Sequence, residues 1–342
     1  MKKFIIRLLT VLLSVLIITC MLSGCSRDVQ ESCLTHVEKW IVDEPATCTE
    51  KGIKHAECET CGRFLKVDEI EVEEHNYVDC TCADCGKSIA THGLAFAKIG
   101  DCYTLAGIGK VLDGEILIPL TYKSLPVTSI FKNAFSDNEF ITSVIIQDNI
   151  LDIGDSAFYQ CAELVDVTIG DGVKRIGQYA FAHCGRLISV TVGNGVENID
   201  YSAFYNCEIL TNIVIGNNVK NIKASAFYGC KNLVDVKLPN SLISIGDSAF
   251  YNCTSLRSVK IPIGVENIGN SAFYRCASLT SIDIPNSVTS IGNSAFYWCD
   301  QLTSINFNGT VAEWNNITKG NSWNFDVPAT KVVCTDGEVA LS

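Results

Sequence analysis

The chain has 342 residues, with 38 acidic and 26 basic side chains and a formal net charge of −12. Proteins that bind nucleic acids neutralise phosphates with clustered Lys and Arg. The charge balance therefore argues against a nucleic-acid partner. A surface of one dominant sign also stays solvated and repels its own copies.

The N-terminus has the features of an export signal. Three basic residues lie among the first seven, and the apolar run 8–22 is too short and wrongly flanked to span a membrane. The run ends in Leu-Ser-Gly-Cys at 22–25, which resembles a bacterial lipobox. The resemblance implies cleavage before Cys25 and lipid attachment to Cys25, which predicts a protein anchored in the membrane by that lipid. The alternative is an ordinary signal peptide that happens to contain a cysteine.

Residues 26–92 are rich in cysteine and histidine and poor in apolar residues. There are two Cys-x2-Cys-Gly pairs, Cys58 with Cys61 and Cys82 with Cys85, and the distance between them in sequence is at the edge of the spacing for a four-thiolate zinc site. Four protein ligands leave no open position, so such a zinc would be structural. In an exported chain these thiols could equally form disulfides, or do neither. The segment also resembles small Cys-rich modules found beside repeats in bacterial surface proteins.

An Ala-Phe pair recurs eight times after residue 133 at a constant 23-residue step. A step that never varies means that each unit stacks on the last in register, so the sequence predicts a repeat solenoid around one continuous core. The phenylalanines of the pairs are Phe135, Phe158, Phe181, Phe204, Phe227, Phe250, Phe273 and Phe296.

The unit 247–269 shows what one coil should contain. Asp247 and Ser248 are good N-cap residues and predict a short helical turn that points Phe250 and Cys253 inward. Leu-x-x-Val-x-Ile at 256–261 then has the period of two typical of a half-buried strand. The apolar residues that follow are expected to cross a turn before the next coil begins.

The repeated Ala-Phe-Tyr-x-Cys-x-x-Leu-x-x-Val-x-Ile-Pro pattern resembles the BspA-like leucine-rich repeats, from about residue 94 to residue 337. The resemblance implies a parallel β-sheet with short helical or 3-10 segments on the convex side. It also implies a surface-exposed or secreted protein, because members of the subgroup are surface-exposed or secreted proteins of bacteria and parasites, and several of them are adhesins. Residues 103–122 and 309–337 resemble the terminal coils of that family, and Trp314 and Trp323 are expected to cover the last coil.

Two further columns keep the 23-residue step. Cysteine recurs at Cys161, Cys184, Cys207, Cys230, Cys253, Cys276 and Cys299. In-register stacking holds their Cβ atoms too far apart for easy bridging, so buried free thiols are expected. Tyrosine follows the phenylalanine at Tyr159, Tyr205, Tyr228, Tyr251, Tyr274 and Tyr297. The last five are candidate binding residues for sugars or proteins, although a purely structural role is the alternative.

The expected organisation is a signal peptide (1–24), a Cys-rich module and linker (25–92), an N-terminal capping coil (93–133), the solenoid (134–308) and a C-terminal cap (309–342). The expected function is non-catalytic adhesion or recognition of a protein or glycan on a host or neighbouring cell. The protein would be lipid-anchored on the extracellular face of the bacterial membrane and would require no cofactor. The alternatives are a cell-envelope spacer without a specific ligand, or an enzyme accessory or zinc-dependent hydrolase built on residues 26–92.

Overall fold

The computed structural model describes residues 38–44, 52–58, 64–70, 77–78, 81–82, 94–108 and 114–341. The chain divides into two compact units, one comprising residues 1–76 and 83–86 and the other residues 77–82 and 87–342. The first unit contains an antiparallel sheet in the order β1-β2-β3. Its strands are β1 (Glu38–Glu44), β2 (Gly52–Cys58) and β3 (Phe64–Ile70).

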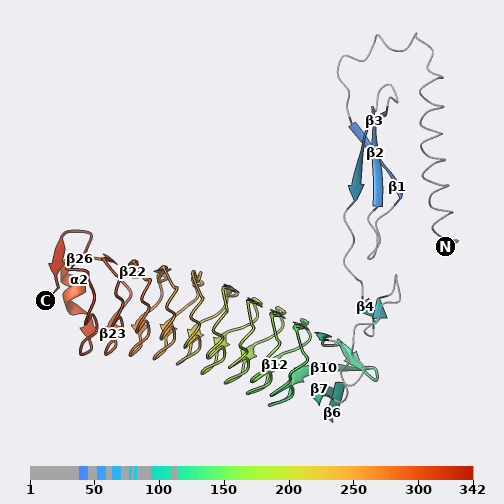
Figure 1. Ribbon diagram of the computed structural model, residues 1–342, viewed down its shortest axis with the longest axis horizontal. Coiled ribbons are helices and arrows are strands. Elements are labelled where there is room, and N and C mark those ends of the chain that lie inside the picture. Colours follow the sequence, from blue (N-terminus) through green and yellow to red (C-terminus); the bar gives the residue numbers. More distant parts are fainter. Residues whose placement is uncertain are drawn as a thin grey trace, which may run out of the picture. The chain divides into compact units, whose positions relative to one another are not determined.

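The second unit is a stack of coils that follow one another in chain order (Figure 1). Its longest sheet has 12 strands and runs from the first coil to the last. Most coils contribute only two residues to it, and successive strands pair in parallel at the 23-residue step. Its strands are β6 (Leu94–Ile99), β7 (Cys102–Ile108), β9 (Thr121–Tyr122), β10 (Leu125–Ile130), β12 (Asp152–Ile153), β14 (Arg175–Ile176), β16 (Asn198–Ile199), β18 (Asn221–Ile222), β19 (Ser244–Ile245), β21 (Asn267–Ile268), β23 (Ser290–Ile291) and β25 (Thr318–Lys319).

A second ladder is formed by the Val-x-Ile strands that the sequence predicts. It divides into two five-stranded sheets, ordered β17-β15-β13-β11-β8 and β20-β22-β24-β26-β27. The first comprises β8 (Glu115–Leu117), β11 (Ser143–Ile146), β13 (Asp166–Ile169), β15 (Ser189–Val192) and β17 (Asn212–Val214). The second comprises β20 (Ser258–Lys260), β22 (Ser281–Pro285), β24 (Ser304–Asn308), β26 (Lys331–Val333) and β27 (Glu338–Ala340). Between the two, the 235–239 segment is joined only by an isolated bridge from Asp235 to Ser258.

The long sheet is a feature that the sequence analysis missed. The residues that form it were expected to cross a turn, and a strand of two residues is too short to show an alternating pattern. In-register stacking nevertheless aligns Ile222 with Ile245 and Ile245 with Ile268. Gly269 follows directly, and a Cβ there would lie 2.5 Å from the backbone nitrogen of Asp247. Glycine therefore permits the close approach of adjacent coils at this corner.

The expected helical turn after Asp247 is not formed. Ser248 and its equivalents have φ between 52° and 57°, the left-handed region, so they cannot begin a right-handed helix. Alternate amides instead bond to the next coil, as Ser248 does to the carbonyl of Asn270 and Phe250 to that of Ala272. The carboxylate of Asp247 accepts the amide of Asn270 at 2.7 Å, so it caps the neighbouring coil rather than its own.

The core confirms the in-register solenoid. Consecutive phenylalanine rings from Phe135 to Phe296 lie 4.7 to 5.5 Å apart between centroids and are nearly parallel. All eight rings are buried, together with the Ala of each coil and the Cys and Leu of the seven coils after the first. Burial of such side chains contributes roughly 1.5 to 3 kcal/mol each at most, so the coils cohere through apolar contact along the whole stack.

Both ends of the core are covered. At the start, β6 pairs antiparallel with β7, and the rings of Phe96 and Tyr122 stack at 4.2 Å. At the end, α2 (Val311–Asn316) begins with a capping box between Thr310 and Glu313. The ring of Trp323 lies edge-on against Phe296, and Trp314 packs on Trp323. Both tryptophans are buried, which confirms that they close the last coil.

Candidate functional site: the tyrosine column

From Tyr205 to Tyr297 the tyrosine column is a continuous ladder of stacked rings on the outside of the coils. Adjacent rings from Tyr205 to Tyr297 have centroids 4.5 to 5.1 Å apart and are tilted by 15° or less. All five candidate binding residues are therefore brought together, and each is half-buried. They are Tyr205, Tyr228, Tyr251, Tyr274 and Tyr297. Their position follows from the phenylalanine ladder, because each tyrosine comes directly after a buried ring whose place is fixed.

Stacking also affects the chemistry of the phenols. Partial burial, together with the neighbouring phenols, raises the pKa of Tyr228 and Tyr274 above the ordinary value. These hydroxyls therefore remain protonated and can donate as well as accept hydrogen bonds. A rigid row of rings with hydroxyl groups loses little conformational entropy when it contacts a partner.

Aromatic residues that the sequence analysis did not include extend the column at its C-terminal end. Phe325 stacks on Tyr297 at 4.9 Å and is 51% exposed. Trp298, 41% exposed, stands edge-on to both Tyr274 and Tyr297. Its indole N–H donates to Asp326 at 2.9 Å, which fixes the ring. The sequence did contain a signal for this extension, because position 298 carries Trp where the two preceding coils have Arg275 and Asn252.

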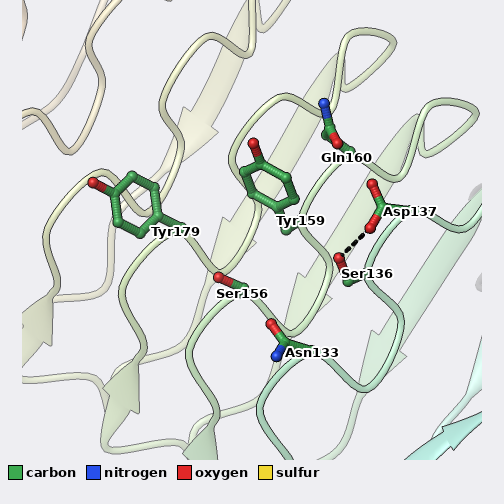
Figure 2. Close-up of a pocket in the computed structure, with 7 residues that line it drawn as sticks. All are labelled: Asn133, Ser136, Asp137, Ser156, Tyr159, Gln160 and Tyr179. Atoms are coloured by element: carbon green, nitrogen blue, oxygen red, sulfur yellow. Dashed lines mark hydrogen bonds between the residues drawn. The ribbon is translucent and has the colours of Figure 1, made fainter.

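At the other end of the column the surface is hollowed. A shallow depression of about 710 Å³ is lined by residues of three consecutive coils. Figure 2 shows these residues. The lining residues fall into three sets whose members are 23 residues apart and so occupy the same position in successive coils. These sets are Asn133, Ser156 and Tyr179; Ser136 and Tyr159; and Asp137 and Gln160. The column is interrupted next to it, where Ala182 replaces tyrosine and His183 touches the rings of Tyr159 and Tyr205.

The cysteine column consists of buried free thiols, as expected. The structure adds that each thiol donates to the phenylalanine carbonyl of the preceding coil, over 3.1 to 3.3 Å. Burial raises the pKa of Cys207 and Cys299 to about 12 and that of Cys253 higher still. Such thiols are protonated and unreactive, so the column is structural.

A charged cluster lies on the side of the long sheet. Arg175 holds Asp152 through two hydrogen bonds of 2.7 and 3.2 Å and reaches Asp155 at 2.9 Å. Its third partner is the buried carboxylate of Asp200, 3.4 Å away, which also pairs with Lys223. Asp152, together with Asp155, raises the pKa of Arg175, so the cluster is a set of ion pairs rather than a cation site.

The remaining candidate residues lie where little or nothing is described. Cys25 falls outside the described residues. Cys58 ends β2 and Cys82 ends β5 (Thr81–Cys82), which pairs with β4 (Tyr77–Val78), but their side chains are not described, nor are Cys61 and Cys85. Within the described ranges, no cluster of His, Cys, Asp and Glu could hold a metal ion. Nor does any described helix have the length and apolar character needed to cross a bilayer.

Parallel coils of constant length, each with a leucine, an alternating strand and a stacked aromatic core, define a leucine-rich repeat solenoid. The sequence pattern of the BspA type leucine rich repeat region matches six copies within residues 119–234 and 220–323. The chain therefore belongs to the BspA type leucine rich repeat family.

Comparison with curated proteins yields no match. Among solved structures, the chain is similar to the leucine rich repeat protein of T. pallidum, with 21% identity, a TM-score of 0.42 and coverage of 71% of this chain and 90% of that one. It is also similar to a leucine-rich repeat protein of Eubacterium ventriosum, with 21% identity, a TM-score of 0.48 and coverage of 60% and 56%. A leucine rich cell surface protein of Faecalibacterium prausnitzii shows 22% identity, a TM-score of 0.30 and coverage of 69% and 98%.

Proposed function

We propose that this protein is a lipid-anchored recognition protein of the bacterial cell surface, whose solenoid binds a protein or glycan of a host or neighbouring cell through the tyrosine column. One observation carries the proposal. Five stacked tyrosines, followed by Phe325 and Trp298, form an aromatic face that stays partly open to solvent. Exposed aromatic residues on a rigid scaffold are typical of binding surfaces.

The proposed surface is distinct from the strip of outward-facing residues on the Val-x-Ile strands, such as Thr168 in β13 and Thr191 in β15. That strip has a groove of about 770 Å³, with Thr168 and Thr191 on its wall. Apart from Val214 and Lys237, the outward side chains that line it are short and polar, and the lining has no Trp, Tyr or Arg, the residues that hot spots favour. The aromatic column is therefore the better candidate for specific contact.

The proposal assigns no catalytic residue. His183 contacts the rings of Tyr159 and Tyr205. The recurring serines occupy the left-handed turn, so they serve the backbone rather than a nucleophilic role.

A double change tests the column. Tyr251→Ala with Tyr274→Ala should leave folding intact and reduce adhesion to partner cells, matrix proteins or glycans by at least about tenfold. The matched control is Thr168→Ala with Thr191→Ala, which alters the strand strip at the same number of positions. Specific saturable binding lost only in the tyrosine variant supports recognition. The spacer alternative is favoured instead if the wild-type protein binds nothing across the panel.

The membrane anchor has its own test. The Leu-Ser-Gly-Cys run at 22–25 supports cleavage of residues 1–24 and lipid attachment at Cys25. Cys25→Ala should shift the protein from the detergent phase to the aqueous phase or leave it uncleaved. Unchanged partitioning would exclude the anchor.

The two Cys-x2-Cys pairs support a structural zinc held by Cys58, Cys61, Cys82 and Cys85. Metal analysis of the full chain purified under reducing conditions should find about one zinc per chain. Absence of zinc, with mass spectrometry detecting bonded cysteine pairs, would assign these thiols to disulfides.

A further inference from the structure

The depression in Figure 2 exists because the tyrosine column lacks its first ring. Ser136 occupies, one coil earlier, the position that Tyr159 has in its own coil. The two coils are in register, since the amide of Asp137 donates to the carbonyl of Tyr159 at 2.7 Å. A ring that would stack on Tyr159 is therefore replaced by a hydroxymethyl group, and space remains above Ser136.

Within the described part of the column, Tyr159 is the tyrosine whose ring faces are left without a stacked partner. The following coil carries Ala182 at its position, and His183 meets the ring edge-on, with centroids 5.5 Å apart and planes at 76°. Elsewhere in the column the rings repeat at 4.5 to 5.1 Å. A flat ring at the Ser136 level would therefore stack on Tyr159 at the spacing found in the rest of the column.

Tyr179 departs from the repeat at the same place. It stands where the flanking coils carry Ser156 and Ser202, yet it keeps the left-handed conformation with φ of 55°. A bulky residue in this region is strained, and such strain is concentrated at functional sites. The side chain is 44% exposed and lines the depression together with Tyr159.

The other lining groups are polar and small. Asn133 and Gln160 contribute carboxamides whose side chains make no hydrogen bond within the described residues, and Ser156 contributes a hydroxyl. Asp137 is the one charged member of this lining, and it accepts from Ser136 at 2.7 Å. Carboxamides and carboxylates match the paired donors and acceptors of vicinal hydroxyl groups.

We propose that a neutral saccharide binds in this depression, with one pyranose ring stacked on Tyr159 in place of the absent ring at Ser136. The ring of Tyr159 offers an electron-rich face to the C–H groups of the sugar, while Asp137, Gln160 and Asn133 bind its hydroxyls. Tyr179 lies on the far side of Tyr159 from Ser136 (Figure 2) and borders the other end of the depression. A neutral ligand fits because the carboxylate of Asp137 repels anions. The polar groups of the lining favour a hydroxylated ring over an aromatic side chain of a protein partner, because an aromatic ring would leave them without partners. The inference rests on the proposed function of the solenoid as a recognition module.

The proposal can be tested by placing a tyrosine ring at position 136. Ser136→Tyr places a protein ring where the sugar would stack and lengthens the existing ladder, so the variant should fold. The probes are the methyl glycosides of glucose, galactose, mannose and N-acetylglucosamine, measured on the full chain in detergent by saturation-transfer NMR. At least one should bind with a Kd of about 1 mM, as expected for so small a ligand. Ser136→Tyr and Tyr159→Ala should each weaken it at least about tenfold, and the control Thr168→Ala, which lies outside the tyrosine column, should not.

Binding of N-acetyltryptophanamide rather than of the glycosides would overturn the inference in favour of a protein partner. So would glycoside binding that survives Ser136→Tyr, or binding of none of the four. If adhesion is lost with the Tyr251 and Tyr274 changes but no glycoside binds, the proposed function stands and the saccharide site fails. If a glycoside binds but the full chain shows no adhesion, the saccharide site stands and the proposed function fails.

Discussion

The Sγ atom of Cys253 lies 3.2 Å from the carbonyl oxygen of Phe227, the phenylalanine of the preceding coil. The same oxygen accepts the amide of Cys230 at 3.3 Å. Cysteine suits this position because it is a small apolar residue that also carries a donor. The thiol column therefore joins each coil to the one before it while filling the core.

Cys253→Ala should destabilise the solenoid by about 1–2 kcal/mol, because it leaves a small cavity and removes the bond to Phe227. Urea denaturation followed by circular dichroism would measure the loss. Cys102→Ala serves as the control, since Cys102 is only partly buried and bonds locally to Ile99 at 3.2 Å. An equal effect of both changes would contradict the assigned role.

Alkaline conditions should destabilise the fold through the same thiols. Unfolded cysteines ionise at their ordinary pKa of about 8.5, whereas burial raises the pKa of Cys207 and Cys299 to about 12 in the folded protein. The stabilisation is complete below the unfolded pKa and is lost as pH rises toward the folded pKa. Each thiol should reduce the free energy of unfolding by about 1.4 kcal/mol per pH unit in this window.

Urea titrations at a series of pH values from neutral to strongly alkaline would follow this loss. A variant with both Cys207→Ala and Cys299→Ala should be less stable at neutral pH but show a shallower decline. Identical slopes would show that other groups, such as the tyrosines, cause the alkaline effect.

Arg175→Gln should lower the free energy of unfolding by about 1–2 kcal/mol, because it leaves Asp152 and Asp155 without their shared cation. The buried carboxylate of Asp200 keeps Lys223 as its charged partner. The expected loss of stability is moderate because the side chain of Arg175 is 40% exposed and solvent screens its ion pairs.

The matched control is Arg186→Gln, which breaks an exposed pair with Glu163. It should change stability by less than about 0.5 kcal/mol. Chemical denaturation of both variants would check the difference, and equal losses would contradict a special role for the cluster.

Local opening should be easiest where the second ladder is interrupted. Segment 235–239 is held within that ladder by one bridge, from Asp235 to Ser258, whereas β13 pairs with strands on both sides. Hydrogen exchange measured by mass spectrometry should find the amides of 235–238 less protected than those of β13 by at least about tenfold. Similar protection would indicate that the continuous long sheet alone sets local stability.

The stacking of the coils, their inward residues and the tyrosine column can all be predicted from the repeat pattern of the chain. A constant 23-residue step places equivalent residues directly over one another, so the members of each column can be found by adding 23 to a residue number. Only the folded coils decided the rest. Ser248 adopts a left-handed turn because its amide bonds to the next coil, and two-residue strands form the longest sheet because their partners lie one whole coil away in sequence. The thiol bonds and the open face of Tyr159 likewise depend on contacts between coils, which no local pattern encodes.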